Sequence, residues 1–289
     1  MVQLSETVRY EVDEGLAILT TANPPLNLYG AATSRGLMDG IERAVGEGAR
    51  AILYRAEGKF FSAGVDVNNF QAAVDGVLGS NGAAGATKLV SQCFEDAPIP
   101  TIAAVHALCL TAAFEAALGC DFIIAAESAK FGLIESTIGL TPLAGGTQRI
   151  ALRAGPIRAY EVAMTGERFD AATFERWNII NRVLPDATFE ADALAFAKRL
   201  AAGPTLALGV TKQVVHAYLS GGLPMADSVM PALTAPLRST EDHKSALKSF
   251  FANGPGKATF VGCDASLRDA SLGARLIVRG AAGPLSLSV

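Results

Sequence analysis

The stretch PTIAAVHALCLTAAFEAALGCDFIIAAESAKFGLIES, residues 100–136, decides the fold of this chain. Within it, residues 101–105 and 122–125 are short apolar runs with the length and composition of buried parallel strands. Between them, small residues predict a helix that Thr111 caps and that ends near Leu118. A strand, a helix and a second strand in this order predict a right-handed crossover in a parallel sheet.

The same alternation extends outward from this stretch. Residues 8–12 and 16–20 predict a hairpin, 31–46 a helix and 51–54 a further buried strand. Buried strands and helices alternate until about Leu184, which indicates an α/β fold with a parallel sheet.

After residue 186 the sequence becomes helical in character. We expect three helices there, at residues 189–202, 205–219 and 240–251. The chain is therefore expected to have a core at 1–200, a helical region at 201–262 and a tail at 263–289. The tail has weak periodicity, and we expect it to be poorly ordered.

Composition narrows the classes of function. The chain has 289 residues, half of them hydrophobic, and a formal net charge of −4, which argues against a general nucleic-acid binder. Four cysteines without CxxC spacing and three dispersed histidines predict neither disulfides nor a metal site. The first 25 residues carry no secretory signal, and polar residues interrupt the apolar run 101–126. We therefore expect a cytoplasmic protein without a membrane span.

Two carboxylates stand where a charge is costly. Glu115 interrupts the apolar run, and Glu135 follows the segment Phe131-Gly132-Leu133-Ile134. A buried carboxylate without a partner costs several kcal/mol or takes up a proton. The pair therefore predicts a desolvated pocket in which protons are transferred.

Two other kinds of site have weaker support. Gly145-Gly146 lies in a loop before a helix, but neither a GxxxxGK[ST] nor a GxGxxG pattern is present, which argues against a nucleotide-phosphate loop. Ser62 lies in Ser-Ala-Gly rather than GxSxG, so no catalytic triad can be inferred from it.

Four motifs in order link the chain to a known family. They are SAGVD at residues 62–66, CDFIIA at 120–125, KFGLIE at 130–135 and AGGTQR at 144–149. With these motifs the chain resembles the enoyl-CoA hydratase/isomerase family, the crotonases, from about residue 16 to 262. The resemblance implies a crotonase-like spiral of ββα units. It also implies a helical C-terminal region, at 201–262, that packs in a homotrimer or homohexamer.

The resemblance also implies a site for an acyl-CoA thioester. The backbone amides of Val65 and Ala112 match the two donors that hold the thioester oxygen in the family, the oxyanion hole. Glu115 and Glu135 match the two hydratase glutamates; we assign Glu135 as the proton donor to C2 and Glu115 as the group that activates water. The further substrate-binding residues expected are Leu26, Leu28, Ala63, Gly64, Asp66, Val67 and Gly139.

The activity implied is that of an enoyl-CoA hydratase, a lyase of fatty-acid or related acyl-CoA metabolism. It needs no metal or redox cofactor, because coenzyme A is part of the substrate. An isomerase, a thioester hydrolase and a non-catalytic acyl-CoA-binding relative remain alternatives on the same fold.

The chain departs from the family pattern at three places. Thr111-Ala112-Ala113 stands where glycines are usual, and Ile134 stands where hydratases often have proline. Asn68-Asn69 replaces a basic residue that some relatives use for the CoA phosphates, a role for which Lys59, Arg149 or a neighbouring subunit could substitute.

Overall fold

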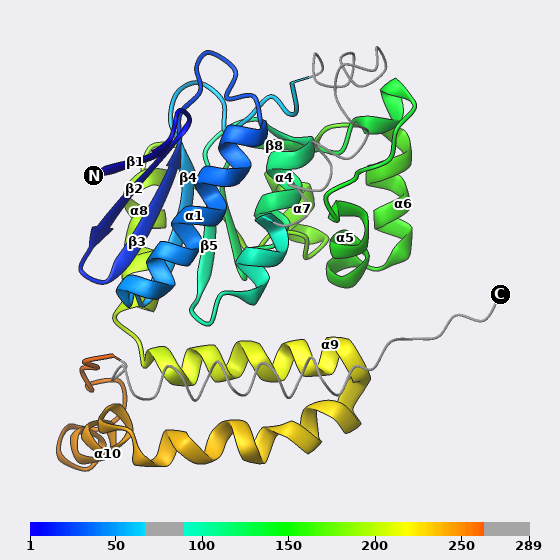
Figure 1. Ribbon diagram of the computed structural model, residues 1–289. Coiled ribbons are helices and arrows are strands. Elements are labelled where there is room, and N and C mark those ends of the chain that lie inside the picture. Colours follow the sequence, from blue (N-terminus) through cyan, green and yellow to red (C-terminus); the bar gives the residue numbers. More distant parts are fainter. Residues whose placement is uncertain (67–89, 263–289) are drawn as a thin grey trace. The chain divides into compact units, whose positions relative to one another are not determined.

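The computed structural model describes residues 1–66 and 90–262 of the chain (Figure 1). The chain forms two compact units, Met1–Ala97 with Thr101–Lys198, and Pro98–Pro100 with Arg199–Val289. The predicted site residue Val67, the pair Asn68-Asn69 and the tail 263–289 lie outside the described residues.

A seven-stranded sheet forms the centre of the first unit, in the order β1-β2-β3-β4-β5-β7-β10. Its strands are β1 Val2–Ser5, β2 Val8–Asp13, β3 Leu16–Thr21, β4 Ala51–Ala56, β5 Thr101–Val105, β7 Phe122–Ala126 and β10 Arg182–Leu184. The first three strands pair antiparallel, and the strands from β3 onward pair parallel. The predicted hairpin and the predicted parallel sheet are both confirmed.

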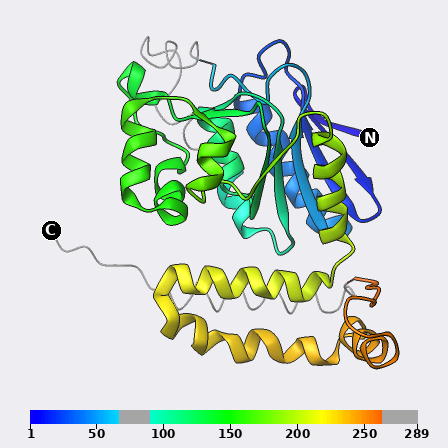
Figure 2. The ribbon, with the colours of Figure 1, turned by 180° about the vertical axis from the view of Figure 1, so that it is seen from behind.

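Helices cover both faces of this sheet. α1, Ala31–Glu47, packs against β1, β2 and β3, and buries Leu37, Ile41 and Ala44 (Figure 1). α8, Phe189–Ala201, lies on the opposite face, as the reverse view shows (Figure 2). Its Phe196 ring contacts Phe122 of β7 edge to face, with the ring centroids 5.3 Å apart.

A smaller sheet and a group of helices complete the first unit. The sheet has the order β6-β8-β9. Its strands are β6 Cys109–Leu110, β8 Lys130–Gly132 and β9 Phe169–Asp170. The remaining elements are α4 Thr111–Leu118, η1 Glu135–Ile138, α5 Gly146–Ala154, α6 Pro156–Thr165 and α7 Ala171–Arg176.

Helix α4 is the most deeply buried of these elements, and every one of its residues is buried. The rings of Phe114, Phe131 and Phe174 pack together between α4, β8 and α7, with centroids 5.2–5.6 Å apart, and contact this helix from one side.

The expected cap of α4 is wrong. Leu110 occupies the N-cap position, no side chain caps the helix, and Thr111 is its first residue. The Thr111 hydroxyl takes part in a different contact, described below.

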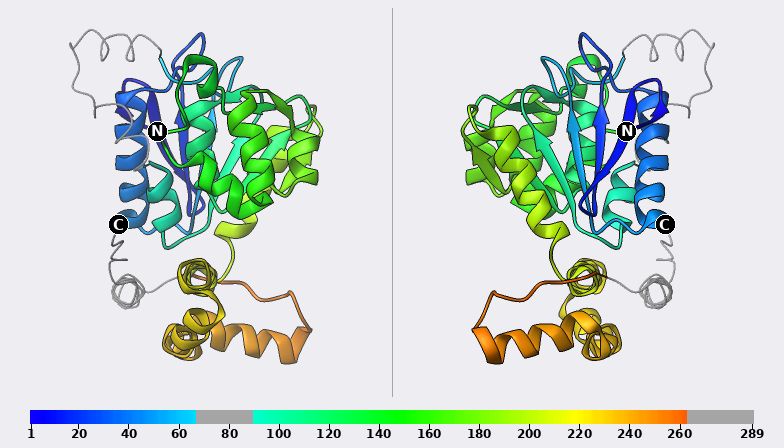
Figure 3. Two further views of the ribbon diagram at one scale, coloured as in Figure 1. Left: turned by 90° about the vertical axis from the view of Figure 1, so that its right-hand side faces the viewer. Right: turned by 90° about the vertical axis from the view of Figure 1, so that its left-hand side faces the viewer.

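The second unit is helical. α9, Thr205–Thr234, contains non-helical backbone at Gly221 and Gly222, where Figures 1 and 3 show that the chain turns back on itself. The two arms pack through an apolar cluster of Ala217, Ala226, Val229 and Leu233, with Val210, Val214 and Met225 at its edge. A short 3₁₀ turn, η2 Ala235–Ser239, leads to α10, Glu241–Asn253. The predicted helix 205–219 corresponds to the first arm of α9; the second arm, after Gly221 and Gly222, was not predicted.

None of the helices in the described ranges is both long and apolar enough to cross a membrane. The apolar run 101–126 instead forms β5, β6, α4 and β7, which confirms the predicted strand–helix–strand arrangement.

Candidate active site

Three chain segments lie side by side at one end of the central sheet. The Ser62 amide donates to the Leu108 carbonyl at 2.9 Å, and the Leu110 amide donates to the Ser62 carbonyl at 3.1 Å. On the other side of residues 62–65, the Ala63 amide donates to the Leu26 carbonyl at 2.9 Å. These backbone bonds bring the SAGVD motif next to the start of α4.

Asn27 fixes the loop that carries the predicted oxyanion amide of Val65. Its backbone has a φ of 50°, and its side-chain amide donates to the carbonyls of Glu57 and Phe60. The Ser62 hydroxyl donates to the Asn27 carbonyl at 2.6 Å and accepts from the Gly64 amide at 3.1 Å. Sequence reasoning missed Asn27; the signal available was that Asn tolerates positive φ better than most residues.

The Val65 amide has an acceptor within the chain. It donates to the Thr111 hydroxyl oxygen, at 3.0 Å. Thr111 has a φ of 50°, a conformation that costs a β-branched residue on the order of 1–3 kcal/mol. Gly64 has a φ of 108°, and a Cβ there would lie 2.7 Å from the Thr111 hydroxyl oxygen. Gly64 is therefore needed both for its conformation and for this contact.

Ala112 provides the second predicted oxyanion amide. It is buried and belongs to the first turn of α4. Amides of a first turn have no acceptor within their own helix and lie at its positive end. The amide of Ala112 is therefore suited to an oxygen that gains negative charge.

Glu115 lies one turn further along α4 and is only 2% exposed. Its Oε1 accepts hydrogen bonds from the amides of Ala144 and Gly146, at 2.8 and 2.9 Å. Burial raises the pKa of Glu115, and the two amides oppose that rise because they stabilise the ionised form. A Cβ on Gly146 would lie 2.8 Å from Glu115 Cγ, so the paired glycines of the AGGTQR motif leave room for this carboxylate.

Arg149 holds the loop that binds Glu115. It is buried and donates to the Gly145 carbonyl at 3.0 Å and to both carboxylate oxygens of Glu95. Because both its charge and its donors are engaged inside the unit, the idea that Arg149 serves the CoA phosphates is wrong.

Glu135 begins the 3₁₀ turn η1, directly after β8 and Leu133-Ile134. It is 8% exposed, and its buried Oε2 has no hydrogen-bond partner among the residues that the structure describes. Burial, and secondly the negative charge of Glu115, raise the pKa of Glu135 to about 7. The two glutamates are thus close enough to interact electrostatically, and they differ in environment: one accepts two amides, the other has an unsatisfied oxygen.

Tyr29 is a further buried residue that the sequence did not single out. Its amide donates to the Gly64 carbonyl at 2.8 Å, and its backbone pairs with Val65. Burial raises the pKa of its phenol, and the charge of Glu115 acts in the same direction, so the hydroxyl stays protonated.

The remaining predicted substrate-binding residues differ in how far they are exposed to solvent. Leu26 is 40% exposed, Leu28 and Asp66 are half-buried, and Gly139 is exposed at the end of η1. Val67 lies outside the described residues. In the described ranges, no three His, Cys, Asp or Glu side chains are grouped so that they could hold a metal ion.

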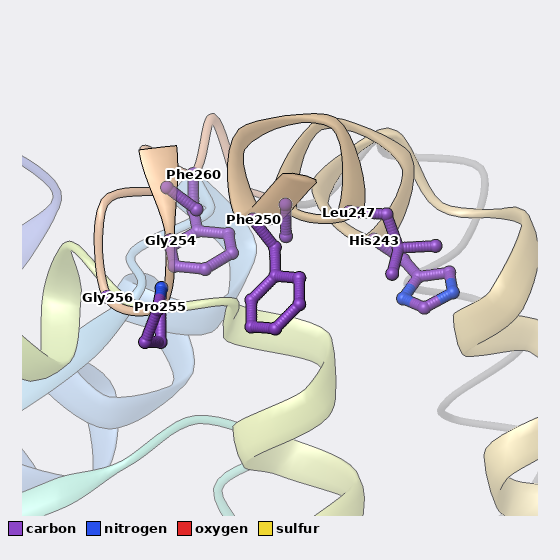
Figure 4. Close-up of a pocket in the computed structure, with 9 residues that line it drawn as sticks. His243, Leu247, Phe250, Gly254, Pro255, Gly256 and Phe260 are labelled. Atoms are coloured by element: carbon purple, nitrogen blue, oxygen red, sulfur yellow. The ribbon is translucent and has the colours of Figure 1, made fainter. Parts of the chain in front are cut away.

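A separate hollow of about 370 Å³ lies in the second unit (Figure 4). α10 and the segment after it line it with His243, Leu247, Phe250, Pro255 and Phe260, among others. None of the predicted site residues lines this hollow, so it is distinct from the glutamate pair.

A family profile described as enoyl-CoA hydratase/isomerase matches residues 11–257. The chain belongs to the enoyl-CoA hydratase/isomerase family. This membership, and the fold that the four motifs implied, are confirmed.

Two relatives of the chain carry names that describe different reactions, a hydratase and a dehydratase. It is 33% identical to a "Probable enoyl-CoA hydratase" of Rhodobacter capsulatus, over 86% of this chain and 96% of that protein. It is 32% identical to a carnitinyl-CoA dehydratase of Salmonella enteritidis, over 74% of this chain and 82% of the relative. The solved structure of an enoyl-CoA hydratase from Polaromonas sp. JS666 superposes with a TM-score of 0.79 at 25% identity, covering 89% of this chain and 99% of the other.

Proposed function

We propose that the chain is an enoyl-CoA hydratase, which adds water across the 2,3 double bond of a 2-enoyl-CoA thioester. One observation supports this assignment most directly. The two buried carboxylates, Glu115 and Glu135, interact electrostatically but differ in environment: burial raises the pKa of both, and two backbone amides oppose that rise at Glu115, whereas the buried Oε2 of Glu135 has no hydrogen-bond partner among the described residues. An addition of water needs both a base and an acid, and such a difference supplies them.

The proposed reaction assigns one proton to each carboxylate. Glu115, whose ionised form accepts two amides, orients a water molecule and takes its proton as the water oxygen bonds to C3. The electrons of the double bond move toward the thioester oxygen, and the resulting enolate is stabilised at the start of α4. Glu135, which is largely protonated below its raised pKa, gives its proton to C2. Proton exchange with solvent then restores both groups.

The oxygen of the enolate is assigned to the region of Val65 and Ala112. Their peptide groups belong to segments that backbone hydrogen bonds hold together. Loss of one such donor costs about 3–4 kcal/mol of transition-state stabilisation in other enzymes.

An absorbance assay tests the proposal. The full-length protein is given crotonyl-CoA and longer 2-enoyl-CoAs, and the loss of the conjugated thioester absorbance is followed. We expect turnover by the wild type, and a loss of about 10²–10⁴-fold in kcat for Glu135→Gln. Glu127→Gln changes an exposed glutamate and is the matched control, which should keep the wild-type rate.

The assay also separates the alternatives. A conjugated product from a 3-enoyl-CoA indicates an isomerase, release of free CoA indicates a hydrolase, and tight CoA binding without turnover indicates a non-catalytic protein. Absence of hydration at every chain length contradicts the proposal.

Dehydration of a 3-hydroxyacyl-CoA is a second candidate, because a carnitinyl-CoA dehydratase is among the relatives. It uses the same bonds in the opposite direction, and the same assay detects it as a gain of absorbance from a hydroxyacyl-CoA.

We further propose that residues 201–262 mediate assembly into a homotrimer or homohexamer, and that the enzyme works in the cytoplasm. Large exposed apolar side chains on the second unit support the proposed assembly, among them Leu223 at 66% and Phe251 at 82% exposure.

A further inference from the structure

Thr111 has an unusual combination of side chain and backbone. Its φ of 50° lies in the left-handed region, which β-branched residues seldom adopt. Strained conformations of this kind persist where the surroundings impose them, and they gather at functional sites. The position of Thr111, one residue before Ala112 and beside Val65, places this strain next to the proposed enolate oxygen.

The hydroxyl of Thr111 accepts one hydrogen bond and keeps a proton that it can donate. Its oxygen accepts the Val65 amide at 3.0 Å, and a hydroxyl that accepts in this way still carries a proton that it can donate. Among the described residues, no acceptor lies in hydrogen-bonding geometry for that proton. Thr111 is 7% exposed, so an unmade hydrogen bond would be costly there.

The backbone around Gly64 holds the Val65 amide against the Thr111 hydroxyl. The Gly64 Cα approaches Thr111 so closely that a Cβ would lie 2.7 Å from the hydroxyl oxygen and 3.3 Å from Cγ2. The Ser62 hydroxyl fixes the loop from its other side, because it donates to the Asn27 carbonyl and accepts from the Gly64 amide. The Val65 amide is therefore directed at the threonine oxygen and is already engaged before any ligand arrives.

We propose that the hydroxyl of Thr111 donates a hydrogen bond to the thioester oxygen, alongside the amide of Ala112, and that the Val65 amide acts through it. This inference rests on the proposed function. The Val65 amide polarises the hydroxyl by donating to its oxygen, and a hydrogen bond in such a chain strengthens the next one. The hydroxyl proton stays on Thr111 throughout, so no bond of the protein is broken.

Three variants separate this role from simple obstruction of the site. Thr111→Val keeps the branched shape and removes the hydroxyl, Thr111→Ser keeps the hydroxyl and removes the methyl group, and Thr111→Gly removes both. We expect Thr111→Val to lower kcat for crotonyl-CoA about 10²–10³-fold with a smaller change in KM. We expect Thr111→Ser to remain within about threefold of the wild type. Thermal unfolding followed by circular dichroism shows that each variant is folded.

A binding measurement gives a readout that does not depend on turnover. A conjugated aryl-enoyl-CoA absorbs at longer wavelength when its carbonyl is polarised by hydrogen bonds. We expect the bound ligand to show this shift in the wild type and in Thr111→Ser, and to lose most of it in Thr111→Val.

The two readouts distinguish the possible failures. Hydration by the wild type with an unchanged kcat and spectrum in Thr111→Val overturns the inference and leaves the proposed function intact. A rate in Thr111→Val equal to that of Thr111→Ser also overturns it, because the hydroxyl then contributes nothing. Thr111→Gly frees the Val65 amide to donate directly, so we expect it to keep more of the rate than Thr111→Val. A spectral shift that depends on the hydroxyl, without hydration on any substrate, supports the contact and contradicts the proposed function.

Discussion

Glu115 and Glu135 carry the same functional group in two different surroundings. Glu115 shares one oxygen between two backbone amides, and those amides are held by the buried Arg149 through the Gly145 carbonyl. Glu135 has no comparable donors at its buried Oε2 among the described residues. The difference is made by the loop before α5 and not by the glutamates themselves.

The raised pKa of Glu135 makes the stability of the protein depend on pH. Its folded-state pKa of about 7 exceeds the ordinary value of 4.5, so between these values the folded protein holds a proton that the unfolded chain has lost. The free energy of unfolding therefore falls as pH rises through this window, by on the order of 2–3 kcal/mol. Glu135→Gln should remove most of this fall between pH 5 and pH 8, as measured by urea unfolding.

The exposed residue Glu127 provides the control for this experiment. Glu127→Gln should leave the pH dependence as it is in the wild type. An equally steep fall in Glu135→Gln would show that Glu135 is ionised in the folded protein well below neutral pH.

In helix α1, replacing a glycine by alanine is expected to stabilise the protein at one position and to destabilise it at another. Gly46 is exposed near the end of the helix, and a Cβ there would meet nothing within 4 Å. Gly40 faces the sheet, and a Cβ there would lie 2.3 Å from Leu19 Cδ2.

Alanine at these two positions gives a matched pair of variants. Gly46→Ala should raise the free energy of unfolding by about 0.5–1 kcal/mol, because alanine loses less conformational entropy in a helix. Gly40→Ala should lower it by about 1–3 kcal/mol through overpacking against β3. Denaturant unfolding of the two variants beside the wild type measures both, and a stabilising Gly40→Ala would mean that α1 lies farther from the sheet.

The whole chain combines an α/β unit that holds the glutamate pair with a helical unit that exposes apolar side chains. Phe251 is 82% exposed and Phe250 51% exposed on α10, where a single chain in water would gain by covering them. We expect the chain to elute as a trimer or hexamer, measured by size exclusion with light scattering.

A charge at this position tests the expectation. Phe251→Glu should shift the assembly toward smaller species, whereas Val12→Glu, which changes a half-exposed residue on β2, should leave it intact. A wild-type chain that is monomeric at micromolar concentration would contradict the proposed role of residues 201–262.

The sequence alone determined the N-terminal hairpin, the helix after it, three buried strands of the main sheet and the helix that carries Glu115. Apolar runs such as residues 101–105 and 122–125 specify buried strands locally, and the structure begins and ends β5 at the same residues. The second arm of α9 was missed, and it is held by an apolar cluster with the first arm that forms only once the chain turns back at Gly221 and Gly222. The sequence also identified Glu115 and Glu135 as candidates for the site, because a carboxylate within an apolar segment is unusual.

Only the tertiary structure decided which groups meet. The contact between the Val65 amide and Thr111 joins residues 46 apart in the chain, and it replaces the cap that the sequence suggested. Arg149 likewise changed from a candidate phosphate ligand into the support of the loop around Glu115. Hydrophobic periodicity is a property of neighbouring residues, whereas a hydrogen bond between distant segments depends on how the whole unit packs, and so the sequence pattern does not contain it.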